Sequence, residues 1–148
     1  MQVEEQHFHG TKLTCNVGKS KKFCKDKSCG ICNISKIGLD QQCIQTNIWF
    51  QRFGQGFYLA PNSSKSHDYT EGAYGCRAML LCDVCPGRKY PLKNTDQNLT
   101  GPPEGFDSIY GQVGRELNYP EIVLHSPDAV LPRYIIVYRK DGTDRLIP

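Results

Sequence analysis

Apolar residues in this chain gather in short runs separated by polar and turn-forming residues, a pattern typical of strands rather than of long helices. No segment sustains the period of a long amphipathic helix, and no internal repeat is present. Six strands are expected, at residues 3–9, 57–60, 78–84, 108–113, 121–125 and 133–139. The pattern therefore predicts an α+β domain in which strands dominate.

Three segments between the expected strands have a different character. Residues 44–53 are rich in aromatic and apolar side chains, so we expect them to pack on the sheet. A short helix is expected at residues 64–69, with Ser63 or Ser64 as its N-cap. Residues 93–105 hold Asn, Asp, Gly and two successive prolines, which indicates a surface loop.

The length and composition bound the architecture and the surroundings of the protein. A chain of 148 residues makes one ordinary domain with its own core, so residues 1–148 are expected to form a single domain. No run approaches the ~18 apolar residues that a membrane span requires. Glu4 and Glu5 stand where an export signal would carry basic residues. We therefore expect a monomeric intracellular protein of the cytoplasm or nucleus that does not enter a membrane.

Cysteines concentrate in a polar insertion at residues 12–43, which is rich in Lys, Ser and Gly. The insertion has no sustained apolar period, so we expect something other than a hydrophobic core to hold it. Cys29 and Cys32 have the two-residue gap that allows two sulfurs to bind one tetrahedral ion, and thiols in a reducing compartment are more often metal ligands than disulfides. A structural zinc site is predicted, with Cys43 as the reserve ligand. The expected ligands are Cys15, Cys24, Cys29 and Cys32. The alternative is that these cysteines are thiols without a metal.

The formal net charge is only +3, but one segment of the insertion is strongly basic. Asp26 is its only acid, and Phe23 is the only aromatic residue among its lysines. Such a cluster could attract the phosphates of RNA or DNA ends, or it could be a solvated loop that lysine keeps soluble. The lysines are Lys12, Lys19, Lys21, Lys22, Lys25, Lys27 and Lys36.

Three separated segments carry candidate chemistry. They read His9-Gly10-Thr11 near the start, Phe53-Gly54-Gln55-Gly56-Phe57-Tyr58-Leu59-Ala60 followed by Ser64-Lys65-Ser66-His67-Asp68-Tyr69, and Tyr119-Pro120-Glu121-Ile122-Val123 near the end. In this order and spacing they resemble the catalytic domain of the poly(ADP-ribose) polymerase family, the ADP-ribosyltransferases with a His-Tyr-Glu triad. The resemblance runs from His9 to about Tyr138, and it is to a small fungal or plant-like branch with a cysteine-rich zinc insertion.

The resemblance implies a fold and a set of site residues. The expected fold has split antiparallel β-sheets with few short helices and a zinc-binding loop. The catalytic triad of the family falls on His9, Tyr58 and Glu121. Without the resemblance, Glu121 would be an ordinary glutamate at a strand edge, and His9 more often a structural histidine.

The resemblance also assigns the binding of NAD⁺. Tyr58 and Tyr69 match the tyrosines that stack on the nicotinamide, and Ser66 matches the serine that binds its amide. Gly10 matches the glycine whose backbone makes the other amide contacts. Thr11 stands in place of the usual serine beside His9, the residue expected to hold a ribose hydroxyl of the adenosine half.

These matches imply an enzyme that consumes NAD⁺ as a substrate. It would release nicotinamide and transfer ADP-ribose to a protein side chain or to a terminal phosphate of nucleic acid. No glycine fingerprint of a dinucleotide-binding βαβ fold is present, so a redox role for NAD⁺ is not expected. The alternative is a non-catalytic module that binds NAD⁺ or ADP-ribose, or a zinc-stabilised module that binds nucleic acid.

Overall fold

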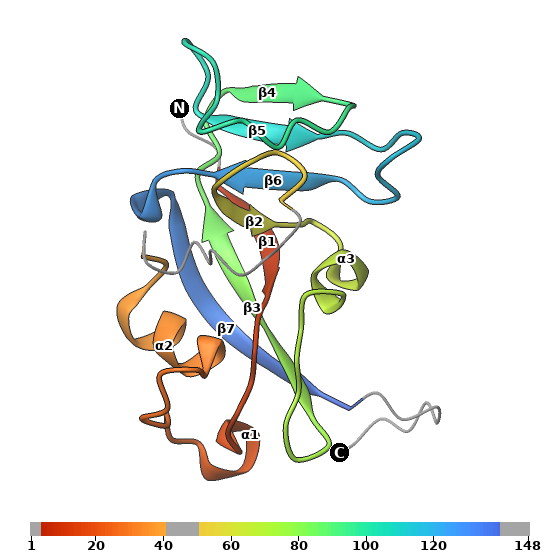
Figure 1. The fold of residues 1–148 in the computed structure, drawn as a ribbon. Coiled ribbons are helices and arrows are strands. Elements are labelled where there is room, and N and C mark those ends of the chain that lie inside the picture. Colours follow the sequence, from red (N-terminus) through yellow and green to blue (C-terminus); the bar gives the residue numbers. More distant parts are fainter. Residues whose placement is uncertain (1–3, 41–50, 140–148) are drawn as a thin grey trace.

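Two β-sheets organise the residues that this computed structural model describes, which are residues 4–40 and 51–139 (Figure 1). The first sheet is antiparallel, with β3 (Arg77–Val84) between β1 (Glu5–Gly10) and β7 (Val130–Tyr138). A bulge interrupts the pairing of β3 with β7 between Leu81 and Cys82. Because β3 is the central strand, its apolar residues supply much of the core.

The second sheet has the order β2–β6–β5–β4 and is mixed. Its antiparallel part consists of β2 (Phe57–Leu59), β6 (Glu121–Leu124) and β5 (Ser108–Gly111). The edge strand β4 (Lys89–Leu92) pairs with β5 in parallel, whereas every other strand pair of the described residues is antiparallel, as the predicted fold requires. All four residues of β6 are buried, as expected for the inner strand of a covered sheet.

All six expected strands are present, with ends that differ by up to three residues. Strand β4 was not expected, because Pro91 lies within it and proline cannot donate to a β-ladder. The proline is tolerated because β4 is an edge strand. The expected loop at residues 93–105 contains neither helix nor strand, which confirms that prediction.

The helix after β2 is placed almost as expected, but its cap differs. Helix α3 spans Ser63–His67, and its N-cap is Asn62, whose side chain accepts a hydrogen bond from the Ser64 N–H at 2.8 Å. The predicted span of 64–69 and the serine cap are therefore wrong. Asn caps a helix as well as Ser does, and the Asn62 side chain satisfies one of the free N–H groups in the first turn.

The insertion contains two helices, α1 (Val17–Ser20) and α2 (Gly30–Ile37). Three residues of α2, Ile31, Cys32 and Ile34, are at most 4% exposed and belong to the main core cluster with residues of β3. The expectation that this segment has no core is therefore wrong. Its few apolar residues give no extended period, yet several of them are buried in the core, whereas Ile37 and Phe23 are exposed.

Two other expectations touch residues outside the described ranges. Of residues 44–53 the structure describes only the last three, of which Phe53 is fully buried in a second core cluster. The reserve ligand Cys43 lies outside the described residues. Among the helices of residues 4–40 and 51–139, none has the length and hydropathy to cross a membrane.

Candidate active site

The candidate site lies where the two sheets meet. β1 and β2 run side by side there (Figure 1), and the Phe8 and Ala60 backbones exchange hydrogen bonds of 2.7 and 2.9 Å. A hollow of about 340 Å³ opens beside this junction. Its lining residues include His9, Gly10, Thr11, Lys12, Ser28, Gly30, Gln51, Gly56, Phe57, Tyr58, Tyr69 and Glu71. Five of the seven residues that the resemblance assigned to catalysis or NAD⁺ binding therefore line one hollow, and the other two, Ser66 and Glu121, do not line it.

His9 is held in a defined tautomer by the neighbouring strand. Its Nδ1 lies 2.9 Å from the backbone oxygen of Tyr58. A carbonyl oxygen can only accept, so Nδ1 carries the proton and donates it. Desolvation lowers the pKa of His9, which keeps the ring neutral at physiological pH. The second ring nitrogen, Nε2, is then available as a hydrogen-bond acceptor for a hydroxyl in the hollow.

Three of the predicted residues, Gly10, Ser66 and Tyr69, lie against one another. A Cβ atom added to Gly10 would overlap the backbone carbonyl of Ser66 and lie 3.2 Å from the Cβ of Tyr69. Helix α3 therefore packs directly on the end of β1. The Ser66 hydroxyl is buried and donates to the Phe8 carbonyl oxygen at 2.8 Å. In this structure Ser66 helps hold α3 on β1, and its hydroxyl would have to turn to donate a hydrogen bond to the oxygen of an amide.

Replacing Gly10 with alanine should therefore damage both the fold and the hollow. Forcing a methyl group into this contact costs typically 1–3 kcal/mol, and shifting α3 would move Tyr69 as well. Urea denaturation and equilibrium titration with NAD⁺ would measure the two effects. The matched control is Gly114→Ala, since a Cβ at Gly114 meets nothing within 4 Å. An alanine at Gly10 with unchanged stability and unchanged NAD⁺ affinity would contradict the packing argument.

The two tyrosines of the hollow are fixed by their hydroxyl groups. The Tyr58 hydroxyl donates to the Gly54 carbonyl oxygen at 2.6 Å and accepts from the Phe53 N–H at 3.0 Å. Burial raises its pKa, so the phenol stays protonated. Tyr69 donates from its hydroxyl to Oε1 of Glu121 at 2.7 Å. Its pKa is raised by burial and by the charge of that carboxylate. Each ring is thus anchored at one end and presents its body to the hollow.

Glu121 is the first residue of β6 and is 1% exposed. Besides Tyr69, its Oε1 has the Lys65 ammonium at 3.6 Å. The other oxygen, Oε2, has no hydrogen-bond partner among the described residues. A buried carboxylate oxygen without a partner is costly and uncommon. Oε2 is therefore an unused acceptor next to Tyr69, although it is buried in this structure.

Three further residues of the site were missed from the sequence. Lys65 lies 5.5 Å from the centre of the Tyr69 ring as well as near Glu121, so it ties the two together. The sequence did offer a signal for Lys65, because it directly precedes the predicted site residue Ser66 in α3. Ser28 and Gly30 line the hollow from the start of α2, although the sequence placed them only in a zinc loop. No local sequence pattern distinguishes Ser28 and Gly30 from the other residues of the insertion.

The four predicted metal ligands come together at the base of the insertion. The sulfurs of Cys15, Cys24, Cys29 and Cys32 all lie within 4.8 Å of one another. Cys15 is 3.5 Å from Cys32 and 3.9 Å from Cys29, measured between sulfurs. Tetrahedral zinc with Zn–S bonds of ~2.3 Å places its sulfurs ~3.8 Å apart. The cluster therefore fits a closed zinc site of four thiolates.

The thiols of the cluster have different pKa values. Desolvation raises the pKa of Cys15 and Cys32, whereas hydrogen bonds from Thr14 and Cys32 outweigh desolvation at Cys29 and lower its pKa to about 7. The Lys36 ammonium donates to the Cys24 carbonyl oxygen at 2.9 Å, which brings a positive charge near the sulfurs.

Comparison with known proteins adds an independent finding. Residues 3–140 match the family model of the poly(ADP-ribose) polymerase catalytic domain. The protein mono-ADP-ribosyltransferase PARP4 of Homo sapiens is 31% identical over 96 residues, which is 60% of this chain and 6% of that protein. The poly [ADP-ribose] polymerase 2-A of Oryza sativa is 34% identical over 82 residues, 54% of this chain and 12% of that protein. The protein mono-ADP-ribosyltransferase PARP3 of Homo sapiens is 37% identical over 62 residues, 39% of this chain and 12% of that protein. These matches span only a small part of each relative.

Proposed function

The chain belongs to the poly(ADP-ribose) polymerase catalytic-domain family, and from this premise we propose that it transfers ADP-ribose from NAD⁺ and releases nicotinamide. The observation that carries the proposal is the buried carboxylate of Glu121 behind Tyr69, with one oxygen unpartnered among the described residues. Breaking the bond between nicotinamide and ribose creates positive charge on the sugar. A fixed negative charge next to that sugar stabilises the transition state more than the ground state.

The predicted site residues have distinct roles in this proposal. Glu121 is the catalytic carboxylate, which accepts a hydrogen bond from a hydroxyl of the nicotinamide ribose. Tyr58 and Tyr69 bind the nicotinamide ring by stacking, for which their anchored hydroxyls fix the rings in advance. Nε2 of His9 accepts a hydrogen bond from a ribose hydroxyl of the adenosine half, and Thr11 lies beside it.

The amide of nicotinamide is bound by Gly10 and Ser66 in this proposal. The contact between the two residues supports it, since the Gly10 backbone and α3 approach each other as closely as a glycine allows. The Ser66 hydroxyl exchanges its bond to the Phe8 carbonyl for one to the amide. Lys65 orients the Glu121 carboxylate in this proposal, because its ammonium lies 3.6 Å from Oε1.

We also propose that the four cysteines of the insertion bind one zinc ion, which holds α2 in place and takes no part in the chemistry. A site closed by four sulfurs has no open coordination position for a substrate. Because clustered thiols are typical of proteins in reducing compartments, we propose that the protein acts as a monomer in the cytoplasm or nucleus.

The acceptor of ADP-ribose is either a protein side chain or a terminal phosphate of nucleic acid. Its identity is tested by incubation with NAD⁺ labelled in the adenylate phosphate and with a panel of acceptors: the protein itself, histones, and RNA and DNA with 5′ or 3′ phosphates. Label on one acceptor class, with release of nicotinamide, would support the proposal and identify the acceptor. Intact NAD⁺ with every acceptor, despite measurable binding of NAD⁺, would show a module that binds without catalysis.

A further inference from the structure

A second hollow lies at the end of the molecule that carries α1. It has a volume of about 570 Å³ and lies between α1, the turn at residues 73–76 and the end of β7. Its apolar lining includes Leu13, Ile135 and Val137. Helix α1 packs closely here, since a Cβ on Gly18 would lie 3.0 Å from a methyl group of Val137. We call this hollow the α1 groove.

The polar rim of the α1 groove is basic. Lys19, Lys21 and Arg139 line it and are exposed. The nearby acids are already engaged. Asp26 accepts hydrogen bonds from Thr14 and Ser28 and lies outside the lining, and Glu71 forms an ion pair of 3.1 Å with Lys12. The lining of the groove holds three cationic side chains and no Asp or Glu, so it suits an anionic partner.

An aromatic side chain stands at the tip of the turn. Tyr74 is 73% exposed, and it has a left-handed backbone with φ of 55°. That conformation is uncommon for a bulky residue and costs free energy. Its neighbours Ala73 and Cys76 form a β-bridge and both line the groove. The fold thus holds an unburied aromatic ring beside a basic, apolar-floored groove.

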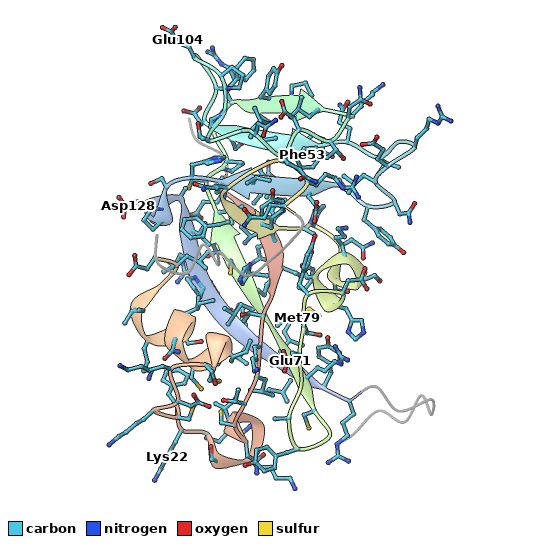
Figure 2. The ribbon with its side chains drawn as sticks, in the orientation of Figure 1. Lys22, Phe53, Glu71, Met79, Glu104 and Asp128 are labelled. Atoms are coloured by element: carbon cyan, nitrogen blue, oxygen red, sulfur yellow. The ribbon has the colours of Figure 1, made fainter. Side chains whose placement is uncertain are left out.

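The zinc cluster holds the basic side of the groove in place. Cys15 and Cys24 stand before and after the segment that carries α1, Lys19 and Lys21. Figure 2 shows Lys22 at this end of the molecule, opposite the end marked by Glu104. A loop fixed at both ends presents its lysines with less loss of entropy on binding than a free loop would.

We propose that the α1 groove binds single-stranded nucleic acid, with lysines and arginine on the phosphates and a base on the Tyr74 ring or the apolar floor. Stacking platforms combined with basic grooves are the recurring means of holding single strands. The bases of a duplex are paired and stacked within it, so they cannot enter an apolar floor without unpairing. The features of the groove therefore favour a single strand over a duplex.

The α1 groove adjoins the NAD⁺ hollow along two chain segments. In the first segment Lys12 lines the hollow and its neighbour Leu13 lines the groove. In the second segment Glu71 lines the hollow and Ala73 lines the groove. The two segments are paired, because the Leu13 N–H donates to the Glu71 carbonyl oxygen at 2.8 Å. A bound strand would lie beside the catalytic site, which deepens the proposed function if the acceptor is nucleic acid. Binding itself is measured without NAD⁺, so its failure and the failure of transfer are distinguishable.

The test is fluorescence anisotropy with a labelled single-stranded RNA and a single-stranded DNA of mixed sequence, across a range of salt. Lys19→Gln with Lys21→Gln should lower the slope of log K against log salt by about 1.4, since each phosphate contact on a single strand contributes about 0.7. The matched control is Lys93→Gln with Arg115→Gln, which removes the same charge from exposed positions outside the groove lining. Equal losses in both double variants would overturn the proposal, because only net charge would then matter.

The role of Tyr74 is tested separately. Tyr74→Asn keeps a residue that tolerates the left-handed backbone, so the fold is preserved, and affinity should fall at least fivefold with loss of stacking. Tyr74→Trp should retain binding. Unlabelled single strands should displace the probe far better than duplex DNA, heparin or a poly-glutamate peptide. Equal displacement by these polyanions, or unchanged affinity in Tyr74→Asn, would overturn the proposal of a single-strand site.

Discussion

Replacing Glu121 with glutamine should lower the rate of ADP-ribose transfer by about 10²–10³-fold, the range found when one preorganised electrostatic group is removed. Glutamine keeps the shape of the side chain and can still accept the hydrogen bond from Tyr69, which measures 2.7 Å in the native protein. What it loses is the negative charge beside the sugar. The loss should therefore appear in kcat, with little change in the affinity for NAD⁺.

Two measurements make this result specific. Glu104→Gln serves as the matched control, since Glu104 is exposed at the far end of the molecule (Figure 2) and should leave transfer unchanged. Thermal unfolding of Glu121→Gln shows whether the variant is folded at the assay temperature. A folded Glu121→Gln protein that transfers ADP-ribose at the native rate would exclude this glutamate as the catalytic carboxylate.

Replacing Cys24 with serine should remove bound zinc and destabilise the protein by several kcal/mol. A ligand present at about 1,000 times its Kd contributes about 4 kcal/mol to the folded state, and that contribution is lost when binding is abolished. Metal content per chain, measured by mass spectrometry of the purified protein, should fall from one zinc to none. A strong chelator added to the native protein should produce the same loss of stability, reversible on adding zinc.

The control for this change is Cys85→Ser, because Cys85 is partly buried and lies outside the cluster. It should keep the full zinc content and most of the stability. Native protein that contains no zinc, and whose mass under non-reducing conditions shows a disulfide among the four cysteines, would contradict the metal site. So would equal zinc content in the Cys24 and Cys85 variants.

Local patterns predicted the strands well, because each one is a short apolar run with clear turn residues at its ends. Strand β4 was missed because Pro91 masks it, and only its place at a sheet edge allows the proline. The core role of α2 was missed for another reason. Ile31 and Ile34 are too few to give a period, and their burial depends on strands far along the chain.

The meeting of the four cysteines was predictable because two-residue spacing and a shared insertion restrict where sulfurs can meet, and the structure brings all four sulfurs within 4.8 Å of one another. The NAD⁺ residues could be chosen only by resemblance, since no local pattern distinguishes a catalytic glutamate from one at a strand edge. Lys65 was missed because its importance lies in two tertiary contacts, with Glu121 and the Tyr69 ring. Such contacts are set by how α3 packs on β1, which sequence spacing alone does not specify.

The most direct test of the central claim is the release of nicotinamide from NAD⁺ by the native protein, followed by chromatography. It does not require the acceptor to be known, because breakage of the nicotinamide–ribose bond precedes or accompanies every transfer. The account predicts release above the spontaneous rate, reduced in Glu121→Gln by the same factor as transfer. NAD⁺ that binds the native protein yet stays intact would contradict it, and would make the hollow a binding site rather than an active site.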